Sequence, residues 1–339
     1  MNQINSLEAV SDAFNRLTVL IVGDVMIDSY LWGKSTRISP EAPVPIVNVV
    51  KREKRLGGAA NVALNVQALG ATPLLCSVVG DDADGADFLR LLEERGLSVA
   101  GMVQSPERVT TIKHRIIASG QQLLRVDSEI ETNLADYEER FLEERYRKLL
   151  KQADVVIFED YDKGIFSQHN IQTFIRLAQE QGVPTVVDPK KKNFLSYVGC
   201  SLFKPNLKEL KEGLGTDFAD ENQAAFEKAV ADLQERLATQ KVLVTLSERG
   251  VFVAEGEAKT YLEAHRRAIS DVSGAGDTVI SIAALCMALQ TSLSFMAGLS
   301  NLGGGLVCEQ VGVVPVDKER LFKEAKQIRL FEVHEYRNA

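Results

Sequence analysis

Residues 153–189 read ADVVIFEDYDKGIFSQHNIQTFIRLAQEQGVPTVVDP, and this stretch decides the fold class. Two short apolar runs, Val155 to Phe158 and Thr185 to Val187, predict buried strands. Between them, Gln168 to Gln181 follows a helical period and is closed by Gly182. A strand, a helix and a second strand in this order predict parallel strands joined by a helix that lies on one face of the sheet.

The same alternation of apolar runs and helical periods continues along most of the 339 residues. Further strands are predicted at Leu17 to Val22, Leu74 to Val79 and Val242 to Leu246, and further helices at Ala83 to Arg95, Glu221 to Gln240 and Val316 to Ile328. Residues 1–339 are therefore expected to form a single α/β domain with a mainly parallel central sheet and helices on both faces. A TIM barrel is an alternative that this alternation also permits.

Two segments, about 30–56 and 109–126, interrupt the pattern, because they are rich in β-branched residues and carry no helical period. They predict a small β lid beside the main sheet, which a TIM barrel would leave unexplained. Val251 to Leu262 predicts a hairpin that turns at Glu255-Gly256. Because exposed sheet edges pair with other chains, the lid also predicts a homodimer joined through it.

The bulk composition limits the classes of partner. A formal net charge of -8 disfavours nucleic acid, because proteins that bind it usually present a basic face. No apolar run approaches the roughly 20 residues that span a bilayer, and the first residues do not resemble a signal peptide. We therefore expect a cytoplasmic protein with no membrane contact. The four cysteines are predicted to be buried thiols, and the four histidines form no metal-binding motif.

The strongest chemical signal is DVSGAGDT, residues 271–278, which is followed at once by the helix-forming run VISIAALCMAL. Glycines at a helix start let backbone N–H groups converge on an anion, and the helix dipole adds positive potential there. Gly274, Ala275 and Gly276 are predicted to surround a transferring phosphoryl group. Asp277 is predicted to accept the proton of an attacking hydroxyl, and we expect the dipole to keep it ionised. The alternative is that Asp277 is an ordinary helix cap.

A second glycine cluster, Gly57-Gly58-Ala59-Ala60-Asn61, also leads into a predicted helix. Glycine permits close approach of the backbone to a ligand, and the Asn61 amide can donate to and accept from hydroxyls. A tight turn between a strand and a helix explains the cluster equally well. Neither G-x-x-x-x-G-K-[ST] nor G-x-G-x-x-G occurs, which disfavours a P-loop and a dinucleotide enzyme.

The pairing of the cluster at 57–61 with the loop at 271–277 resembles the two signatures of the ribokinase-like (phosphofructokinase B) carbohydrate kinases. The resemblance extends from Val19 to about Leu330. It implies a three-layer α/β/α sandwich with a small β lid, which transfers the γ-phosphoryl group of ATP to a sugar hydroxyl. It also implies Mg²⁺ and, as a further family trait, a monovalent cation near the later loop.

The resemblance assigns four residues to ATP. Asn206 and Glu209 match the family's N-x-x-E motif, which implies a place near the ATP phosphates and, for Glu209, an indirect role in Mg²⁺ binding. A helix N-cap followed by a glutamate is the alternative for this motif. Thr245 and Gly250 lie in a segment similar to the family's nucleotide-binding strand and turn, where Ser247 stands in place of a frequent glycine.

Within the family, five segments resemble the heptose 7-phosphate kinases of bacteria. They are GDVMID (23–28), TRISPEAPVP (36–45), QQLLRVD (121–127), DYDKG (160–164) and VDPKK (187–191). This resemblance implies phosphorylation of D-glycero-D-manno-heptose 7-phosphate at O1, toward ADP-heptose for the lipopolysaccharide core. Some such enzymes carry a C-terminal adenylyltransferase domain with an H-x-G-H motif. The sequence stops before any such motif, so we expect a stand-alone kinase.

A heptose 7-phosphate needs polar groups for its hydroxyls and cations for its phosphate. Asp24, Asn61 and Asp160 are expected to bind hydroxyls, with Gly57 and Gly58 beside the sugar. The phosphate ligands are expected among five basic residues: Arg37, Lys113, Arg125, Lys163 and Lys190. Two alternatives stay open, namely a kinase for another sugar or a nucleoside, and a catalytically silent relative that only binds a sugar or nucleotide.

Overall fold

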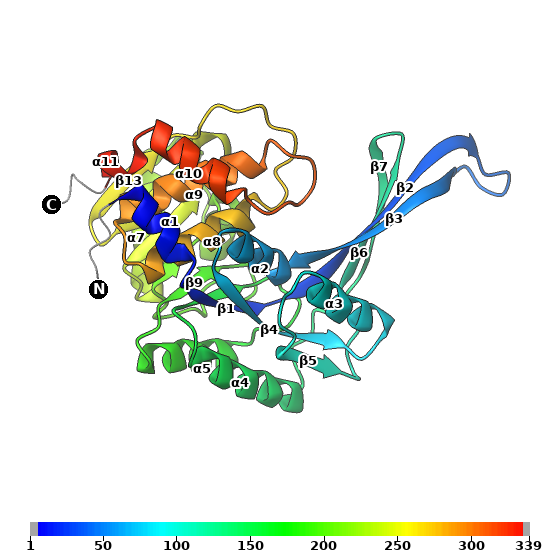
Figure 1. Cartoon of the computed structure of the whole chain (residues 1–339), viewed down its shortest axis with the longest axis horizontal. Coiled ribbons are helices and arrows are strands. Elements are labelled where there is room, and N and C mark those ends of the chain that lie inside the picture. Colours follow the sequence, from blue (N-terminus) through cyan, green and yellow to red (C-terminus); the bar gives the residue numbers. More distant parts are fainter. Residues whose placement is uncertain (1–5, 335–339) are drawn as a thin grey trace.

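The computed structural model describes residues 6–334, and its main element is an open nine-stranded sheet (Figure 1). Its order is β13-β12-β11-β10-β9-β8-β1-β4-β5, and all neighbouring strands are parallel except in the antiparallel β11-β12-β13 end. The strands are β1 (Thr18–Gly23), β4 (Thr72–Gly80), β5 (Gly101–Ser105), β8 (Val155–Glu159), β9 (Thr185–Asp188), β10 (Leu202–Phe203), β11 (Lys241–Thr245), β12 (Val251–Glu255) and β13 (Ala258–Leu262). Because the sheet is open rather than closed, the TIM-barrel alternative is excluded.

Helices cover both faces of this sheet, which gives three layers. They are α1 (Leu7–Phe14), α2 (Ala59–Ala68), α3 (Ala83–Glu94), α4 (Asp136–Leu150), α5 (Gln168–Glu180), α6 (Leu207–Leu214), α7 (Gln223–Leu237), α8 (Ala275–Ala288), α9 (Leu293–Val307), α10 (Lys318–Gln327) and α11 (Leu330–His334). Figure 1 shows α4 and α5 on one side of the sheet and α8, α9 and α10 on the other. The predicted sandwich is therefore confirmed.

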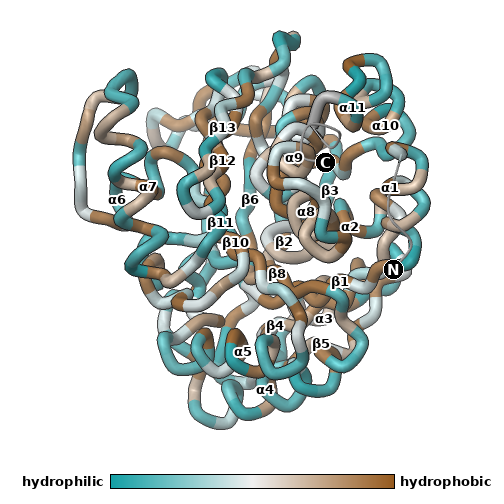
Figure 2. The backbone as a smooth tube through the Cα atoms, turned by 90° about the vertical axis from the view of Figure 1, so that its left-hand side faces the viewer, coloured by the Kyte–Doolittle hydropathy of each residue, from teal (hydrophilic) through white to brown (hydrophobic). Residues whose placement is uncertain are grey.

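Two apolar cores hold the layers together. In β1, Val19 and Ile21 pack into the core shared with α2, α8 and α9, whereas Leu20 and Val22 pack into the core shared with α4, α5 and α7. Successive side chains of a strand point to opposite faces, so one continuous apolar run supplies both cores. Figure 2 shows hydrophobic segments gathered around β1 and β8 in the middle of the molecule.

The predicted helices are confirmed, with ends set by capping residues. α5 begins after Ser167, whose side chain accepts a hydrogen bond from Asn170 N, and α7 and α10 begin after Asn222 and Asp317, which cap in the same way. The hairpin at 251–262 is confirmed as β12 and β13. Neither α4, α9 nor the two-residue strand β10 was predicted from the sequence.

The second sheet corresponds to the predicted lid segments. It has four strands in the order β3-β2-β6-β7, and it is called the lid sheet below. Its strands are β2 (Val25–Ile38), β3 (Pro45–Gly58), β6 (Ile112–Ala118) and β7 (Gln121–Ser128). β2 pairs with β6 in parallel, and the two outer pairs are antiparallel. Figure 1 shows β2, β3 and β7 extending away from the body of the molecule.

The lid sheet joins the body through very short connections. β1 ends at Gly23 and β2 begins at Val25, so Asp24 alone separates them. β3 ends at Gly58 and α2 begins at Ala59. Both connections lie at the edge of the main sheet where β1 ends, which places the roots of the lid sheet beside the carboxyl ends of the parallel strands.

Two further observations concern bulk properties. Among residues 6–334, no helix combines the length and apolar character needed to cross a bilayer. The four cysteines all lie within the described part of the chain, where they are buried and form no disulfide, as predicted.

Candidate active site

The carboxyl ends of β1, β8 and β9 gather buried carboxylates at one edge of the main sheet. The register pairs Gly23 with Glu159, and Glu159 with Asp188, so Asp24 and Asp160 directly follow β1 and β8 beside Asp188, the last residue of β9. All three carboxylates are buried. Open α/β sheets bind ligands at this edge, so this is where a site is expected.

The glycine loop and Asp277 meet this edge at the start of α8. Gly274 is the N-cap residue with φ of 79°, and Asp277 lies in the first turn with only 7 % of its surface exposed. Asn61 Nδ2 donates to Asp277 Oδ2 over 2.5 Å, and the Tyr161 hydroxyl donates to Asp277 Oδ1 over 3.1 Å. The two glycine clusters of the sequence therefore lie side by side. Below, the strand-end carboxylates are Asp24, Asp160 and Asp188 together with Asp277, which lies at the start of α8 beside the strand ends.

Burial is the largest influence on the pKa of Asp277. It raises the pKa of this carboxyl, an effect that Asp188 reinforces and that the hydrogen bonds from Asn61 and Tyr161 oppose. Removal of water at this buried helix start therefore moves the pKa upward, against the lowering that the helix dipole alone would give, and that Asp277 is ionised stays a prediction. A raised pKa makes the carboxylate a stronger base than an exposed one.

The loop before α8 was predicted to offer backbone N–H groups to an anion, and the structure removes Ala275 from that set. Ala275 N donates to Val272 O over 3.3 Å within the loop, so its N–H group is already engaged. A Cβ atom placed on Gly276 would lie 3.7 Å from Asp188 Oδ2 and 3.8 Å from Lys204 Nζ. Glycine at 276 thus leaves room next to a buried ammonium group.

Lys204 is a site residue that the sequence analysis missed. Its Nζ lies 2.8 Å from Asp188 Oδ2, and the side chain is buried. Burial alone would lower the pKa of Lys204, but the charges of Asp188 and Glu209 more than offset this, so its pKa is raised and it stays cationic. Its place two residues before Asn206, in the string KPNLKE, is the sequence signal that could have identified it.

The Asn206 and Glu209 motif forms a capping box at the start of α6. Asn206 Oδ1 accepts from Glu209 N over 2.8 Å, and Asn206 N donates to Glu209 Oε2 over 2.9 Å. The other oxygen, Glu209 Oε1, pairs with Lys190 Nζ over 2.5 Å. The structure therefore shows the capping role, while a role toward ATP and Mg²⁺ stays a prediction.

The predicted nucleotide turn follows β11. Thr245 forms a β-bridge with Asn206, which links the turn to the start of α6. Ser247 has φ of 56°, a left-handed conformation that explains why glycine suits this position. Gly250 has φ of 92°, and a Cβ atom there would meet Leu262 O at 2.1 Å, so the chain permits only glycine.

Gly57 and Gly58 are needed by the packing of the lid root. A Cβ atom on Gly57 would lie 2.5 Å from Asp28 Oδ2, and one on Gly58 would lie 2.4 Å from Asp24 O. Gly58 also has φ of 60°. The tight-turn alternative therefore accounts for both glycines, and contact with a sugar stays a prediction for them.

Asp24 and Asp160 hold the turn after β8. Asp24 Oδ2 accepts from Tyr161 N and Lys163 N over 2.8 and 3.1 Å, and Asp24 Oδ1 accepts from Ile165 N over 3.2 Å. Asp160 Oδ2 accepts from the Tyr197 hydroxyl over 2.7 Å. Burial, reinforced by Asp160, raises the pKa of Asp24 to about 7. Both carboxylates therefore organise the turn, and their contact with sugar hydroxyls stays a prediction.

The structure divides the five basic candidates into two groups. Lys113 and Lys163 share Glu129, whose carboxylate oxygens lie 3.0 and 2.8 Å from the two Nζ atoms. Each lysine also has a second carboxylate partner, Asp127 for Lys113 and Glu131 for Lys163.

The other three candidates lie elsewhere. Lys190 Nζ stands over the Tyr161 ring, 5.4 Å from its centroid, next to the strand-end carboxylates. Arg37 is exposed near the outer end of β2, opposite Ile46. Arg125 lies on β7 and pairs with Asp127 over 3.0 Å. Lys113, Lys163 and Lys190 are therefore placed better than the two arginines for a ligand at the sheet edge.

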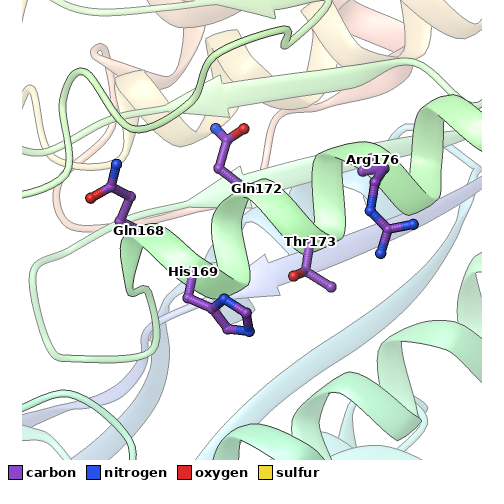
Figure 3. Close-up of a pocket in the computed structure, with 5 residues that line it drawn as sticks. All are labelled: Gln168, His169, Gln172, Thr173 and Arg176. Atoms are coloured by element: carbon purple, nitrogen blue, oxygen red, sulfur yellow. The ribbon is translucent and has the colours of Figure 1, made fainter.

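A separate surface depression does not belong to this site. It has a volume of about 590 Å³ and lies along the outer surface of α5, where Figure 3 shows its side chains: Gln168, His169, Gln172, Thr173 and Arg176. None of these is a candidate residue, and most are exposed. The depression contains none of the strand-end carboxylates.

Comparison with known proteins adds independent information. The family described as pfkB family carbohydrate kinase matches residues 16–319. The Bifunctional protein HldE of Syntrophotalea carbinolica is 38% identical over 307 residues, which cover 90% of this chain and 62% of that protein. The protein of the same name from Helicobacter pylori is 40% identical over 295 residues, which cover 87% of this chain and 63% of that protein. The chain thus spans less than two thirds of these relatives' length.

Solved structures support the fold. Phosphofructokinase-2 from Escherichia coli in complex with potassium superposes with a TM-score of 0.76 at 20% identity, covering 92% of this chain and 99% of that one. Ribokinase from Arabidopsis thaliana complexed with ribose and ATP superposes with a TM-score of 0.71 at 18% identity, covering 91% and 99%. At these identities the likeness shows that the fold is ribokinase-like.

Proposed function

Because this chain belongs to the pfkB family of carbohydrate kinases, we propose that it phosphorylates D-glycero-D-manno-heptose 7-phosphate at O1 with ATP. The product, a heptose 1,7-bisphosphate, would lead toward ADP-heptose for the lipopolysaccharide core. The observation that carries a kinase reaction is the buried Asp277 carboxylate at the start of α8, beside the glycine loop. The choice of sugar rests on the five resembling segments and on the relatives named HldE.

Asp277 would accept the proton of the attacking O1 hydroxyl. The N–H groups of Gly274 and Gly276 and the ammonium of Lys204 would offset the negative charge that develops on the transferring phosphoryl group, whereas the N–H group of Ala275 is engaged by Val272 O. Gly274 and Gly276 would keep the loop open for that group, because a side chain at 276 would point toward Asp188 and Lys204. In phosphoryl transfer, positioning and charge stabilisation matter more than proton removal.

Magnesium is part of this proposal. Among the described residues, no three or more His, Cys, Asp or Glu side chains are arranged to ligate a metal ion by themselves. Mg²⁺ usually keeps several waters and is bound through substrate phosphates and one or two carboxylates, and Glu209 fits such an indirect role. The ion would neutralise phosphate charge. A monovalent cation near the 271–276 loop is also proposed, in line with the potassium complex of Escherichia coli phosphofructokinase-2.

The sugar 7-phosphate would bind to Lys113 and Lys163. The two ammonium groups are brought together by Glu129 and are largely shielded from solvent, so they can meet a dianion jointly. Lys190, which stands over Tyr161, would lie between the sugar and the ATP phosphates. The lid sheet would close over the sugar and exclude water, which limits hydrolysis of ATP.

The lid sheet is also the proposed dimer interface of a cytoplasmic homodimer. Exposed apolar side chains lie on β2, β3 and β7 and on the connection between β2 and β3: Ile38, Val44, Val49, Val50, Leu123, Leu124 and Val126. Exposed apolar residues on open strands favour pairing with another chain. Sedimentation velocity at micromolar concentration should give a dimer, and a monomer there would contradict this interface.

A ³¹P NMR assay tests the proposed function. The protein is incubated with MgATP and, in parallel, with heptose 7-phosphate, ribose, fructose 6-phosphate or adenosine. We expect ADP and a new anomeric phosphate signal only with heptose 7-phosphate. A phosphorylated product from one of the other acceptors would show that this acceptor, and not heptose 7-phosphate, is the substrate. No ADP with any acceptor would favour the catalytically silent alternative.

A further inference from the structure

Tyr161 lies at the centre of the candidate site, although the sequence analysis did not select it. It is the second residue of the 160–164 turn, between β8 and α5. Its hydroxyl donates to Asp277 Oδ1 over 3.1 Å, while Asn61 Nδ2 donates to Asp277 Oδ2 over 2.5 Å. The two oxygens of the carboxylate thus each receive one uncharged donor, from two different parts of the chain.

We propose that Tyr161 is a positioning residue that fixes the plane of the Asp277 carboxylate, so that an oxygen lone pair faces the incoming sugar hydroxyl. An ionised carboxylate offers about four lone-pair positions, of which the two donors occupy two. Donors on both oxygens oppose rotation of the carboxylate. This inference deepens the proposed kinase function and rests on it.

The phenol itself is held on several sides. Tyr161 N donates to Asp24 Oδ2 over 2.8 Å, and the ring lies under Lys190 Nζ at 5.4 Å from its centroid. Lys190 in turn pairs with Glu209 over 2.5 Å. Tyr161 therefore stands between Asp24 at the root of the lid sheet and Glu209 at the start of α6. A ring held in this way can direct its hydroxyl at one atom.

The backbone supports the same placement. Asp162 has φ of 57° and Gly164 has φ of 91°, so the turn is bent sharply on the C-terminal side of Tyr161. Asp162 N donates to Asp160 Oδ1 over 2.8 Å, and Lys163 N donates to Asp24 Oδ2 over 3.1 Å. Two strand-end carboxylates thus hold the turn that carries the phenol.

The groups around Asp277 determine how its pKa should change when the Tyr161 hydroxyl is removed. Glu159 on β8 and Asp188 on β9 face it with negative charge, and Lys204 after β10 faces it with positive charge. The Tyr161 hydrogen bond favours the ionised carboxylate, so its loss raises the pKa of Asp277 further. Since the base must be ionised to act, the acid limb of the rate profile moves to higher pH.

The test compares wild-type protein with Tyr161→Phe. We expect kcat at neutral pH to fall about 10-fold and the acid limb of the kcat profile to move up by about one pH unit, which is the scale of one hydrogen bond to a charged group. The KM for ATP should stay within about two-fold, because the substitution removes only the hydroxyl, whose hydrogen bond goes to Asp277, and keeps the ring under Lys190. Tyr146→Phe is the matched control: its hydroxyl also donates one buried hydrogen bond, to Phe174 O over 2.8 Å, but far from Asp277 in the chain's other core, so its acid limb should not move.

A second substitution covers the case in which Tyr161→Phe fails to fold. A 3-fluorotyrosine at 161 keeps the ring and hydroxyl but is a stronger donor, so the acid limb should move to lower pH. An unchanged acid limb with a folded Phe or fluorotyrosine variant would overturn the inference, as would a rise in kcat/KM for the sugar, because that would mean the phenol blocks the acceptor. If wild-type protein itself does not phosphorylate the sugar, the proposed function fails instead.

Discussion

Charged side chains have different partners and different exposure at the strand-end carboxylates and on the lid sheet. At the sheet edge, Asp24 and Asp277 are buried and their partners are mostly uncharged N–H and O–H donors. On the lid sheet, charged groups pair with each other near solvent, as Glu53 does with Lys51 and Arg55. Burial strengthens every electrostatic interaction and raises the cost of leaving a group unpaired. Substitutions should therefore have large effects at the sheet edge and small ones on the lid sheet.

The largest effect is expected at Asp277. Asp277→Asn should lower kcat by roughly 10²-fold or more, the usual scale for a lost acid or base, because the amide cannot accept the sugar proton. ATP affinity measured by calorimetry should be nearly unchanged. Glu53→Gln, which removes one carboxylate from the lid sheet, is the control. It should lower kcat by less than roughly two-fold, because Glu53 pairs with Lys51 and Arg55 and with none of the proposed ligands. Near-normal turnover of Asp277→Asn would show that Asp277 is not the base and that substitutions at the sheet edge are no more damaging than those on the lid sheet.

The next effect is a pH dependence of stability. The pKa of Asp24 is raised to about 7, mainly by burial and then by Asp160, so the folded state binds this proton more tightly than the unfolded state does. Its contribution is fully present below the unfolded pKa near 3.9 and is lost as pH rises through about 7. The free energy of unfolding should thus fall by about 2 kcal/mol between pH 5 and pH 7.

Urea unfolding at pH 5, 6 and 7 measures this fall. Asp24→Asn should flatten the slope whatever its effect on absolute stability. Glu53→Gln should leave the slope unchanged, because the hydrogen bonds from Arg55 and Lys51 lower the pKa of Glu53 to about 2, outside this window. Parallel slopes for wild type and Asp24→Asn would show that the buried carboxyl does not titrate as inferred.

A smaller effect separates two basic residues that the sequence alone treats alike. Lys163→Ala should raise the KM for the sugar phosphate about 10-fold, because its side chain is 13% exposed and is proposed to bind the phosphate together with Lys113, while the KM for ATP stays within about two-fold. Arg125→Ala should change neither value by more than about two-fold, because this side chain is 53% exposed on β7. Equal effects of the two substitutions on steady-state kinetics would contradict the division drawn here.

The smallest effect is expected on the lid sheet itself. Lys51 Nζ lies 2.9 Å from Glu53 Oε2, and its side chain is 64% exposed. Lys51→Ala should change the free energy of unfolding by less than about 0.5 kcal/mol, because exposed ion pairs are weak. Denaturant titration measures this. A loss above about 1 kcal/mol would show that lid charges contribute like buried ones.

The sequence predicted what depends on local pattern. The unit made of β8, α5 and β9 could be identified because strand and helix periods are visible within a few residues. The two glycine clusters could be identified because each is a short continuous motif. Tyr161 could not, because it becomes a candidate site residue only when β8 brings it to the start of α8. Lys204 was overlooked, although it stands two residues before Asn206 in the string KPNLKE. The direction of the Asp277 pKa shift could not be predicted either, since the amount of water removed around this carboxyl depends on α2 and on the 160–164 turn.

One short connection carries a mechanical consequence. Asp24 is the single residue between a strand of the main sheet and a strand of the lid sheet, and its carboxylate also holds the backbone of Tyr161. The neighbouring root runs from Gly58 directly into the helix that carries Asn61. A tilt of the lid sheet would therefore turn the backbone at both points that support the two donors of Asp277. Movement of the lid sheet would then change the orientation of the Asp277 carboxylate through a connection that is only one residue long.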